Sequence, residues 1–170
     1  MTITTSPRIH SATAAGERGI AKLLHRLIAT DRSPASLVLR LTLALVMFPH
    51  GAQKVLGWFG GNGFSGTLGY FTGALGVPAL FAVLVFAAEF LGPIGLALGA
   101  FSRVAAAGMV AVMTGAIFLA HLPNGFFMNW TGAQAGEGFE FHLLVIGISI
   151  ALMLTGSGRW SFDRWLAPKV

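Results

Sequence analysis

The sequence contains no cysteine among its 170 residues. This absence excludes disulfides, thiol redox chemistry, iron–sulfur clusters and haem attached through cysteine as products of this chain alone. Charge is scarce as well, because only 10% of the residues are charged whereas soluble domains carry roughly 25%. Too little polar surface therefore exists to coat a water-exposed globule, and a soluble fold is excluded.

Apolar residues make up 55% of the chain, and the mean hydropathy is +0.75. A helix that crosses a bilayer needs about 20 mostly apolar residues. Four stretches approach this length, and they predict an all-α fold: a four-helix transmembrane bundle over 34–166 that follows a basic tail over 1–33. The predicted membrane helices cover residues 34–58, 78–101, 103–122 and 138–156.

Positive charge is concentrated before the first predicted membrane helix, at Arg103 in the short second connection, and after the last helix. The other two connections, over 57–77 and 123–137, contain no Lys or Arg. Cytoplasmic loops are enriched in these two residues, so both termini are predicted to be cytoplasmic in a multi-pass protein of the inner membrane. No signal peptide is predicted before Arg32. The same distribution indicates that the net charge of +5 reflects membrane topology and not a nucleic-acid partner.

The basic tail ends in a segment, 18–29, with the periodicity of an amphipathic helix. Its apolar residues are Ile20, Leu23, Leu24, Leu27 and Ile28, and the opposite face carries Lys22, His25 and Arg26. Two interpretations stay open: an interfacial helix on the anionic inner leaflet, or a solvated, disordered tail. At the other end of the chain, Trp160 and Trp165 stand next to arginines, which is typical of a membrane interface.

Two series of small residues at helical spacing predict close packing between membrane helices. The series in the second helix is Gly92, Gly95 and Gly99. The series in the third helix is Ala107, Ala111 and Gly115. The third helix is therefore predicted to be a central element that its neighbours contact through these small residues.

Ionisable residues are predicted to gather in the outer half of the bundle. They are His50, Lys54, Glu89, His121 and Glu140. Glu89 lies about 11 residues into its helix, close to the bilayer midplane. A charge at that depth is costly, so Glu89 should face the interior within hydrogen-bonding reach of at least one of the other four. His142 follows Glu140 by two positions, roughly 200° around the helix, so the two are not expected both to face inward.

Three interpretations of this cluster stay open. Its members can pair only to avoid an uncompensated charge, bind a quinone head group or proton, or hold a cofactor such as haem. Haem would take His50 and His121 as axial ligands, but no spacing motif supports it. The sequence has no Glu-x-x-His motif, and Glu140-Phe141-His142 has the wrong spacing for one helical face, so no metal site is predicted.

Several motifs occur in a characteristic order. They are Arg40, His50-Gly51 with Lys54, Glu89 with Gly92, Gly99 with Arg103, Glu140, and the ending Gly156–Asp163. In their order and spacing the chain resembles the DoxX family of small four-helix membrane proteins over about residues 37–166. It departs from the family at Ser157, where a proline is common, and at Phe141-His142, where an aromatic-proline pair is common.

The resemblance implies a redox-associated membrane subunit that interacts with quinone or with a soluble or membrane-bound partner oxidoreductase. Members of the family are linked to quinol oxidation and to thiosulfate oxidation with quinone as acceptor. The resemblance implies no catalytic residue, because the family has no agreed active site, and it leaves open whether the chain is an enzyme. A non-catalytic scaffold that recruits a partner and a small transporter remain the alternatives.

Overall fold

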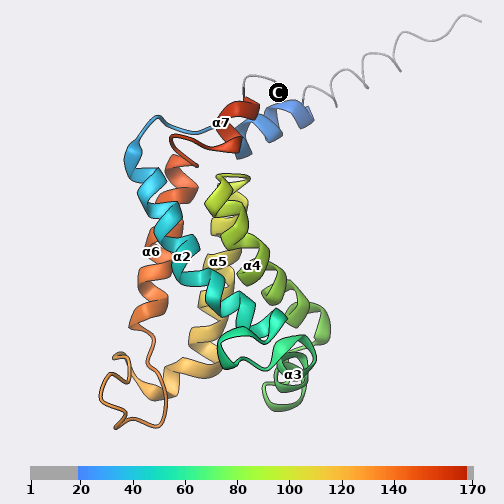
Figure 1. Ribbon diagram of the computed structural model, residues 1–170, viewed down its shortest axis with the longest axis vertical. Coiled ribbons are helices and arrows are strands. Elements are labelled where there is room, and N and C mark those ends of the chain that lie inside the picture. Colours follow the sequence, from blue (N-terminus) through green and yellow to red (C-terminus); the bar gives the residue numbers. More distant parts are fainter. Residues whose placement is uncertain (1–18, 168–170) are drawn as a thin grey trace, which may run out of the picture.

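The computed structural model describes residues 19–167, and every regular element within them is helical. Figure 1 shows four long helices packed side by side. They are α2 (Pro34–Leu56), α4 (Ala79–Leu98), α5 (Ser102–Ala116) and α6 (Glu140–Thr155). The predicted all-α class is therefore confirmed.

Three stretches of the described chain are long and apolar enough to cross a membrane: Pro34–Leu56, Ala79–Leu98 and Ser102–Asn124. The last consists of α5 and two short segments that extend it, the π-helical η3 (Ile117–His121) and the 3-10 turn η4 (Leu122–Asn124). α6 is apolar but has only 16 residues. Three of the four predicted spans thus have the required length, and the fourth crossing remains a prediction.

Local sequence explains where α2 and α4 begin or end. The Ser33 hydroxyl accepts a hydrogen bond from the backbone N–H of Ala35 at 3.1 Å, and Pro34 occupies the first turn of α2. α2 stops at Gly57 and α4 stops at Gly99, where φ is 73° and 65°. Glycine adopts this left-handed conformation without steric cost, so these residues terminate the two helices.

The two ends of the bundle differ in structure (Figure 1). One end, named here the α3 end, comprises η1 (Trp58–Gly60), α3 (Gly63–Gly69), the π-helical η2 (Tyr70–Ala74), η3 and the connection over 125–139. The opposite α7 end comprises α7 (Phe162–Leu166), a helix over 19–28 and the tight α4–α5 turn. The basic segment is thus helical over 19–28, and its contact with a membrane surface stays a prediction.

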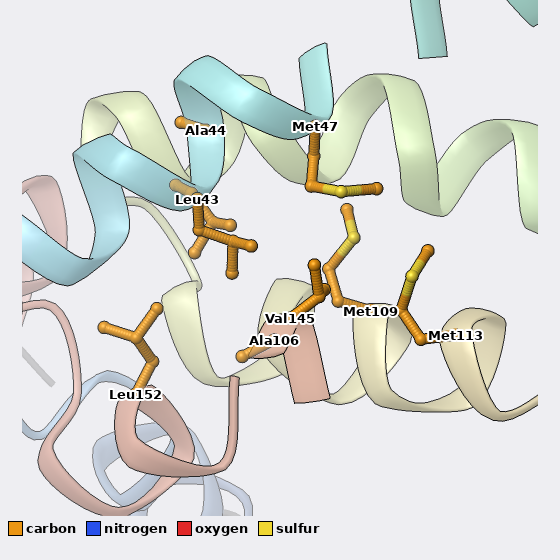
Figure 2. Packing of buried hydrophobic residues seen from close by; sticks show 9 residues of the cluster. Leu43, Ala44, Met47, Ala106, Met109, Met113, Val145 and Leu152 are labelled. Atoms are coloured by element: carbon orange, nitrogen blue, oxygen red, sulfur yellow. The ribbon is translucent and has the colours of Figure 1, made fainter. Parts of the chain in front are cut away.

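The apolar core lies between α2, α4, α5 and α6. Its members are Leu43, Ala44, Met47, Leu96, Ala106, Met109, Met113, Val145 and Leu152. Figure 2 shows Met47 of α2 pointing toward Met109 and Met113 of α5. Methionine is unbranched and flexible, so it fills irregular space between the packed helices.

The prediction that α5 contacts its neighbours through Ala107, Ala111 and Gly115 is wrong. Ala107 and Ala111 are exposed, and a Cβ atom added to Gly115 would meet no other atom within 4 Å. α5 instead buries the face that carries Met109 and Met113, because these long side chains fill the space toward α2 and α6. α5 packs between α4 and α6, but not through Ala107, Ala111 and Gly115.

Two other glycines do mark close helix packing. A Cβ atom on Gly51 of α2 would overlap the backbone of Glu89 and come within 2.7 Å of the Cα atom of Phe90 on α4. A Cβ atom on Gly92 would lie 2.9 Å from the terminal methyl of Met109 on α5. α2 therefore approaches α4 closely through Gly51, and Gly92 of α4 leaves room for the Met109 side chain of α5.

Arg40 closes the α7 end of the bundle. Its side chain is only 1% exposed, and its guanidinium donates five hydrogen bonds. The acceptors are the carbonyl oxygens of Leu96, Ala97, Ser157, Arg159 and Trp160, at 2.6–3.3 Å. Two of these belong to the last turn of α4, where a helix leaves carbonyl groups without partners. All five hydrogen bonds of this buried cation thus go to backbone carbonyl groups.

Asp163 has the complementary role at the start of α5. Its carboxylate accepts hydrogen bonds from the backbone N–H groups of Phe101 and Ser102 at 2.7 and 3.1 Å. Arg103 meanwhile donates to the carbonyl oxygens of Met153 and Leu154, the last turn of α6. Charged side chains therefore satisfy three helix ends here, with the sign that each end favours.

Candidate functional site

A cavity of about 480 Å³ lies at the α3 end, between α2, α4, η2, η3 and the start of α6. Four of the predicted site residues line it: His50, Lys54, Glu89 and His121. Most of the remaining wall is apolar and includes Met47, Met113, Met128, Phe71 and Phe141. A mainly apolar hollow with a few polar groups is the usual form of a small-molecule binding site.

Lys54 and Glu89 form an ion pair in this cavity, with 2.5 Å between Lys54 Nζ and Glu89 Oε2. Glu89 is only 4% exposed, while the Lys54 side chain is 24% exposed. The pair is a direct contact between opposite charges. The close approach of α2 at Gly51 to the Glu89 backbone brings the two helices into reach. The predicted contact between Glu89 and the cluster is confirmed.

His121 and His142 form a second polar group in the cavity wall. Their ring centroids lie 4.1 Å apart, with an angle of 48° between the rings. His142 is 6% exposed, and its Nδ1 atom has no hydrogen-bond partner within the described residues. His121 Nδ1 lies 2.9 Å from the carbonyl oxygen of Glu137. A buried ring nitrogen without a partner is unusual and can serve a ligand as donor or acceptor, depending on the tautomer.

Glu140 does not line the cavity. Its Oε1 atom accepts hydrogen bonds from the backbone N–H of Met128 at 2.8 Å and from Trp130 Nε1 at 3.3 Å. Glu140 therefore holds the connection over 125–139 against the start of α6. The structure agrees with the expectation that Glu140 and His142 do not both face inward, and it turns His142 toward the cavity.

Two further polar residues line the cavity that the sequence analysis did not select, Tyr70 and Glu137. Tyr70 is the one tyrosine of the chain and lies on η2, while His121 ends η3. Both segments are π-helical, a rare geometry that is frequent at functional sites. The signal for Tyr70 in the sequence is weak, because it stands in a glycine-rich connection without a charged neighbour.

His50 lines the same cavity from α2, and its ring centroid lies 5.8 Å from that of Phe141. Within residues 19–167 no group of three or more His, Asp or Glu side chains could hold a metal ion. The arrangement offers a cationic amine, a carboxylate and imidazoles around an apolar space. It can therefore bind a neutral polar ring by hydrogen bonds and exchange protons with it.

Comparison with known proteins adds to this geometry. The DoxX family model matches residues 35–122. The chain is 30% identical over 131 residues to "Putative oxidoreductase CatD" of Bacillus subtilis. The aligned region covers 77% of this chain and 86% of that protein. The chain is also 32% identical over 155 residues to "Uncharacterized membrane protein Rv3486" of Mycobacterium tuberculosis. That alignment covers 85% of this chain and 88% of the relative. No solved structure matches.

The family match spans the helices that carry Arg40, the Lys54–Glu89 pair and His121. It covers more than half of the chain, and the two relatives align over most of their own length. Together with the three apolar helices, these similarities confirm the predicted resemblance. This chain is a membrane protein that belongs to the DoxX family.

Proposed function

We propose that the cavity binds a quinone head group and that the chain is a redox-associated subunit working with a partner oxidoreductase. The observation that carries the proposal is the joint presence of the Lys54–Glu89 pair and the unpartnered Nδ1 atom of His142 in one apolar cavity. A quinone head group is a flat, apolar ring with a carbonyl oxygen at each end. It requires apolar walls and hydrogen-bonding groups at two positions.

The residues present fit these requirements. The volume of about 480 Å³ lies within the range of about 300–1,000 Å³ that small-molecule sites occupy. Phe71 and Phe141 supply aromatic surface for a flat ring. The Lys54 ammonium and a His142 ring nitrogen are the groups that would donate to the two carbonyl oxygens.

Each polar residue then has a role that follows from its chemistry. Reduction of a quinone to a quinol takes up two electrons and two protons, and the partner oxidoreductase would supply the electrons. Lys54 would hydrogen-bond one oxygen of a bound quinone, and Glu89 beside it would be the group that exchanges a proton. The second proton would be exchanged at the imidazole of His142, whose ring lies against that of His121, because imidazole both donates and accepts a proton.

The α7 end of the bundle disfavours the transporter alternative. A transport path requires polar groups that continue from the cavity to the other end. Between the two ends stand the methionines and leucines of the core, and the guanidinium of Arg40 is occupied by five carbonyl oxygens. The scaffold alternative remains an outcome of the experiment below.

We further propose that the chain lies in the inner membrane with four crossings, 34–166 being the membrane domain and 1–33 its cytoplasmic tail. The absence of Lys and Arg from the connections over 57–77 and 123–137 supports this orientation. The cavity then opens toward the outer side, and α7 together with the helix over 19–28 lies at the cytoplasmic side.

The test is mass analysis of quinones extracted from the protein after purification in a mild detergent. The parent chain should retain quinone, and Lys54→Met should retain about tenfold less, since a hydrogen bond from a charged donor is worth about 1.5–3 kcal/mol. Gly115→Ala is the matched control, because Gly115 contacts no neighbouring atom within 4 Å of its added Cβ.

Absence of quinone from the parent, together with no binding of an added short-chain ubiquinone or menaquinone analogue, would refute the proposal. If partner activity in membranes then survived both Lys54→Met and Glu89→Gln, the scaffold alternative would replace it.

A further inference from the structure

A second hollow, with a volume of about 600 Å³, lies at the α7 end and shares no residue with the cavity. We name it the arginine hollow. Its lining consists of Arg32, Arg159, Trp160, Ser161, Arg164 and Trp165. Half of these residues are arginines and none is acidic, so the hollow concentrates positive charge.

The backbone below the arginine hollow is firmly held. Arg159 Nε donates to the carbonyl oxygen of Arg32 at 3.0 Å, which joins the start of α2 to the connection before α7. Arg40 binds the carbonyl oxygens of Arg159 and Trp160 from inside the bundle. The Ser161 hydroxyl caps α7. Three guanidinium groups, one just before α2 and two near the start of α7, are thus presented on a fixed frame.

Nearby acids do not neutralise these arginines. Asp163 is 1% exposed, and its carboxylate is used by the N–H groups at the start of α5. Asp31 accepts hydrogen bonds from the backbone N–H of Ser33 and from the Ser36 hydroxyl. Within residues 19–167 no ion pair joins Arg32, Arg159 or Arg164 to a carboxylate. Positive charge therefore remains available to an anionic ligand.

Trp160 adds a second, independent sign of a binding surface. Its φ is 48°, a left-handed conformation that is strained for a bulky residue, and its side chain is 84% exposed. The chain thus accepts backbone strain while it holds a large indole away from the core. Indoles prefer the headgroup level of a bilayer.

We propose that the arginine hollow binds the phosphate of an anionic phospholipid in the leaflet that surrounds the α7 end. Guanidinium groups bind phosphate oxygens through paired N–H donors, and basic hollows next to membrane helices recognise anionic head groups. Free phosphate offers the same chemistry, but the neighbouring apolar surface favours a lipid. Ile20 and Leu23 of the helix over 19–28 are 62% and 58% exposed at this end of the bundle (Figure 1).

The experiment is native mass spectrometry of the full chain in detergent, incubated separately with phosphatidylglycerol, phosphatidylcholine and inorganic phosphate. Phosphatidylglycerol should be retained preferentially. Each substitution Arg32→Gln, Arg159→Gln or Arg164→Gln should weaken its retention about fivefold, the contribution of one basic residue near an anionic lipid surface. Arg26→Gln is the matched control, because it removes the same charge from the helix over 19–28 outside the hollow.

Equal loss with Arg26→Gln would overturn the proposal, because general surface charge would then account for retention. Equal retention of phosphatidylcholine, or of inorganic phosphate alone, would overturn it as well. Trp160→Ala gives a second variant whose exposed side chain does not support the core; it should weaken lipid retention and leave thermal unfolding unchanged.

Discussion

Arg40 and Asp163 bind opposite sides of the same tight turn. The guanidinium of Arg40 donates hydrogen bonds to the last carbonyl groups of α4, and the carboxylate of Asp163 accepts them from the first N–H groups of α5. The two side chains belong to α2 and α7, the first and the last helix of the predicted membrane domain. The turn is therefore hydrogen-bonded to both of them. Each charge has the sign that the adjacent helix end favours.

Arg40→Lys should destabilise the protein although the charge is kept. A lysine has three donors and cannot serve five carbonyl oxygens, so at least two bonds are lost. The expected loss is about 3 kcal/mol, since each bond from a charged donor contributes about 1.5–3 kcal/mol. Thermal unfolding in detergent measures it, with Arg32→Lys at an exposed position as control. Equal stability of the two variants would contradict the role of Arg40.

Gly51→Ala should separate α2 from α4. The added methyl would overlap the backbone carbonyl of Glu89, which cannot move without shifting α4. A loss of about 1–3 kcal/mol is expected, as for other overpacked positions. Gly147→Ala is the matched control on α6, because its Cβ meets nothing within 4 Å and alanine favours a helix by up to about 1 kcal/mol. A Gly51→Ala protein as stable as Gly147→Ala would argue against this contact.

Lys54→Met and Glu89→Gln should each destabilise the protein, and the double variant should recover part of the loss. Removal of Lys54 leaves the buried carboxylate of Glu89 without its partner, and removal of Glu89 leaves the half-buried ammonium of Lys54 without its own. The coupling free energy from the double-mutant cycle should fall within about 0.5–3 kcal/mol. Strictly additive effects on unfolding would mean that the two groups do not interact in the membrane.

Gly115→Leu should be tolerated, contrary to the expectation from the small-residue series. Gly115 has open space around its Cβ position, so a leucine there would meet lipid and not a neighbouring helix. The midpoint of thermal unfolding in detergent should match that of the parent. A large loss of assembly would show that another chain packs against this face of α5.

Reporter fusions test the proposed topology. A cytoplasmic reporter fused after Val170 and a periplasmic reporter inserted within 125–136 should both be active. A periplasmic reporter that is active after Val170 would contradict the orientation, and with it the cytoplasmic side assigned to the arginine hollow.

The Lys54–Glu89 contact could be predicted, because two physical constraints apply to it. Helical spacing puts His50 and Lys54 on one face of α2, and the cost of a charge at depth requires Glu89 to find a partner. The partners of Arg40 could not be predicted in this way, because they are backbone carbonyl groups and not side chains of opposite charge. Their positions depend on chain ends that meet only in the folded bundle.

The sequence likewise could not predict which face of α5 is buried. In lipid neither apolar face has a hydrophobic preference for the interior, so the space left by the other helices decides between methionines and small residues. At the start of α6 the connection over 125–139 decides the orientation, because its N–H groups bind Glu140 and thereby turn His142 inward. Helical periodicity separates Glu140 from His142 but does not choose between them.

The length of α6 has a consequence for the surrounding bilayer. Its 16 residues span about 24 Å at 1.5 Å per residue, whereas the hydrocarbon layer is about 30 Å thick. Leu144 and Leu154, toward its two ends, are 68% and 74% exposed, so a bilayer crossed by α6 would contact the helix directly. A crossing by α6 therefore requires locally compressed lipid on that flank, while the longer α2 imposes no such demand. This mismatch favours residence in thin membranes, and it favours association of the thinned flanks of neighbouring molecules, which would relieve the deformation.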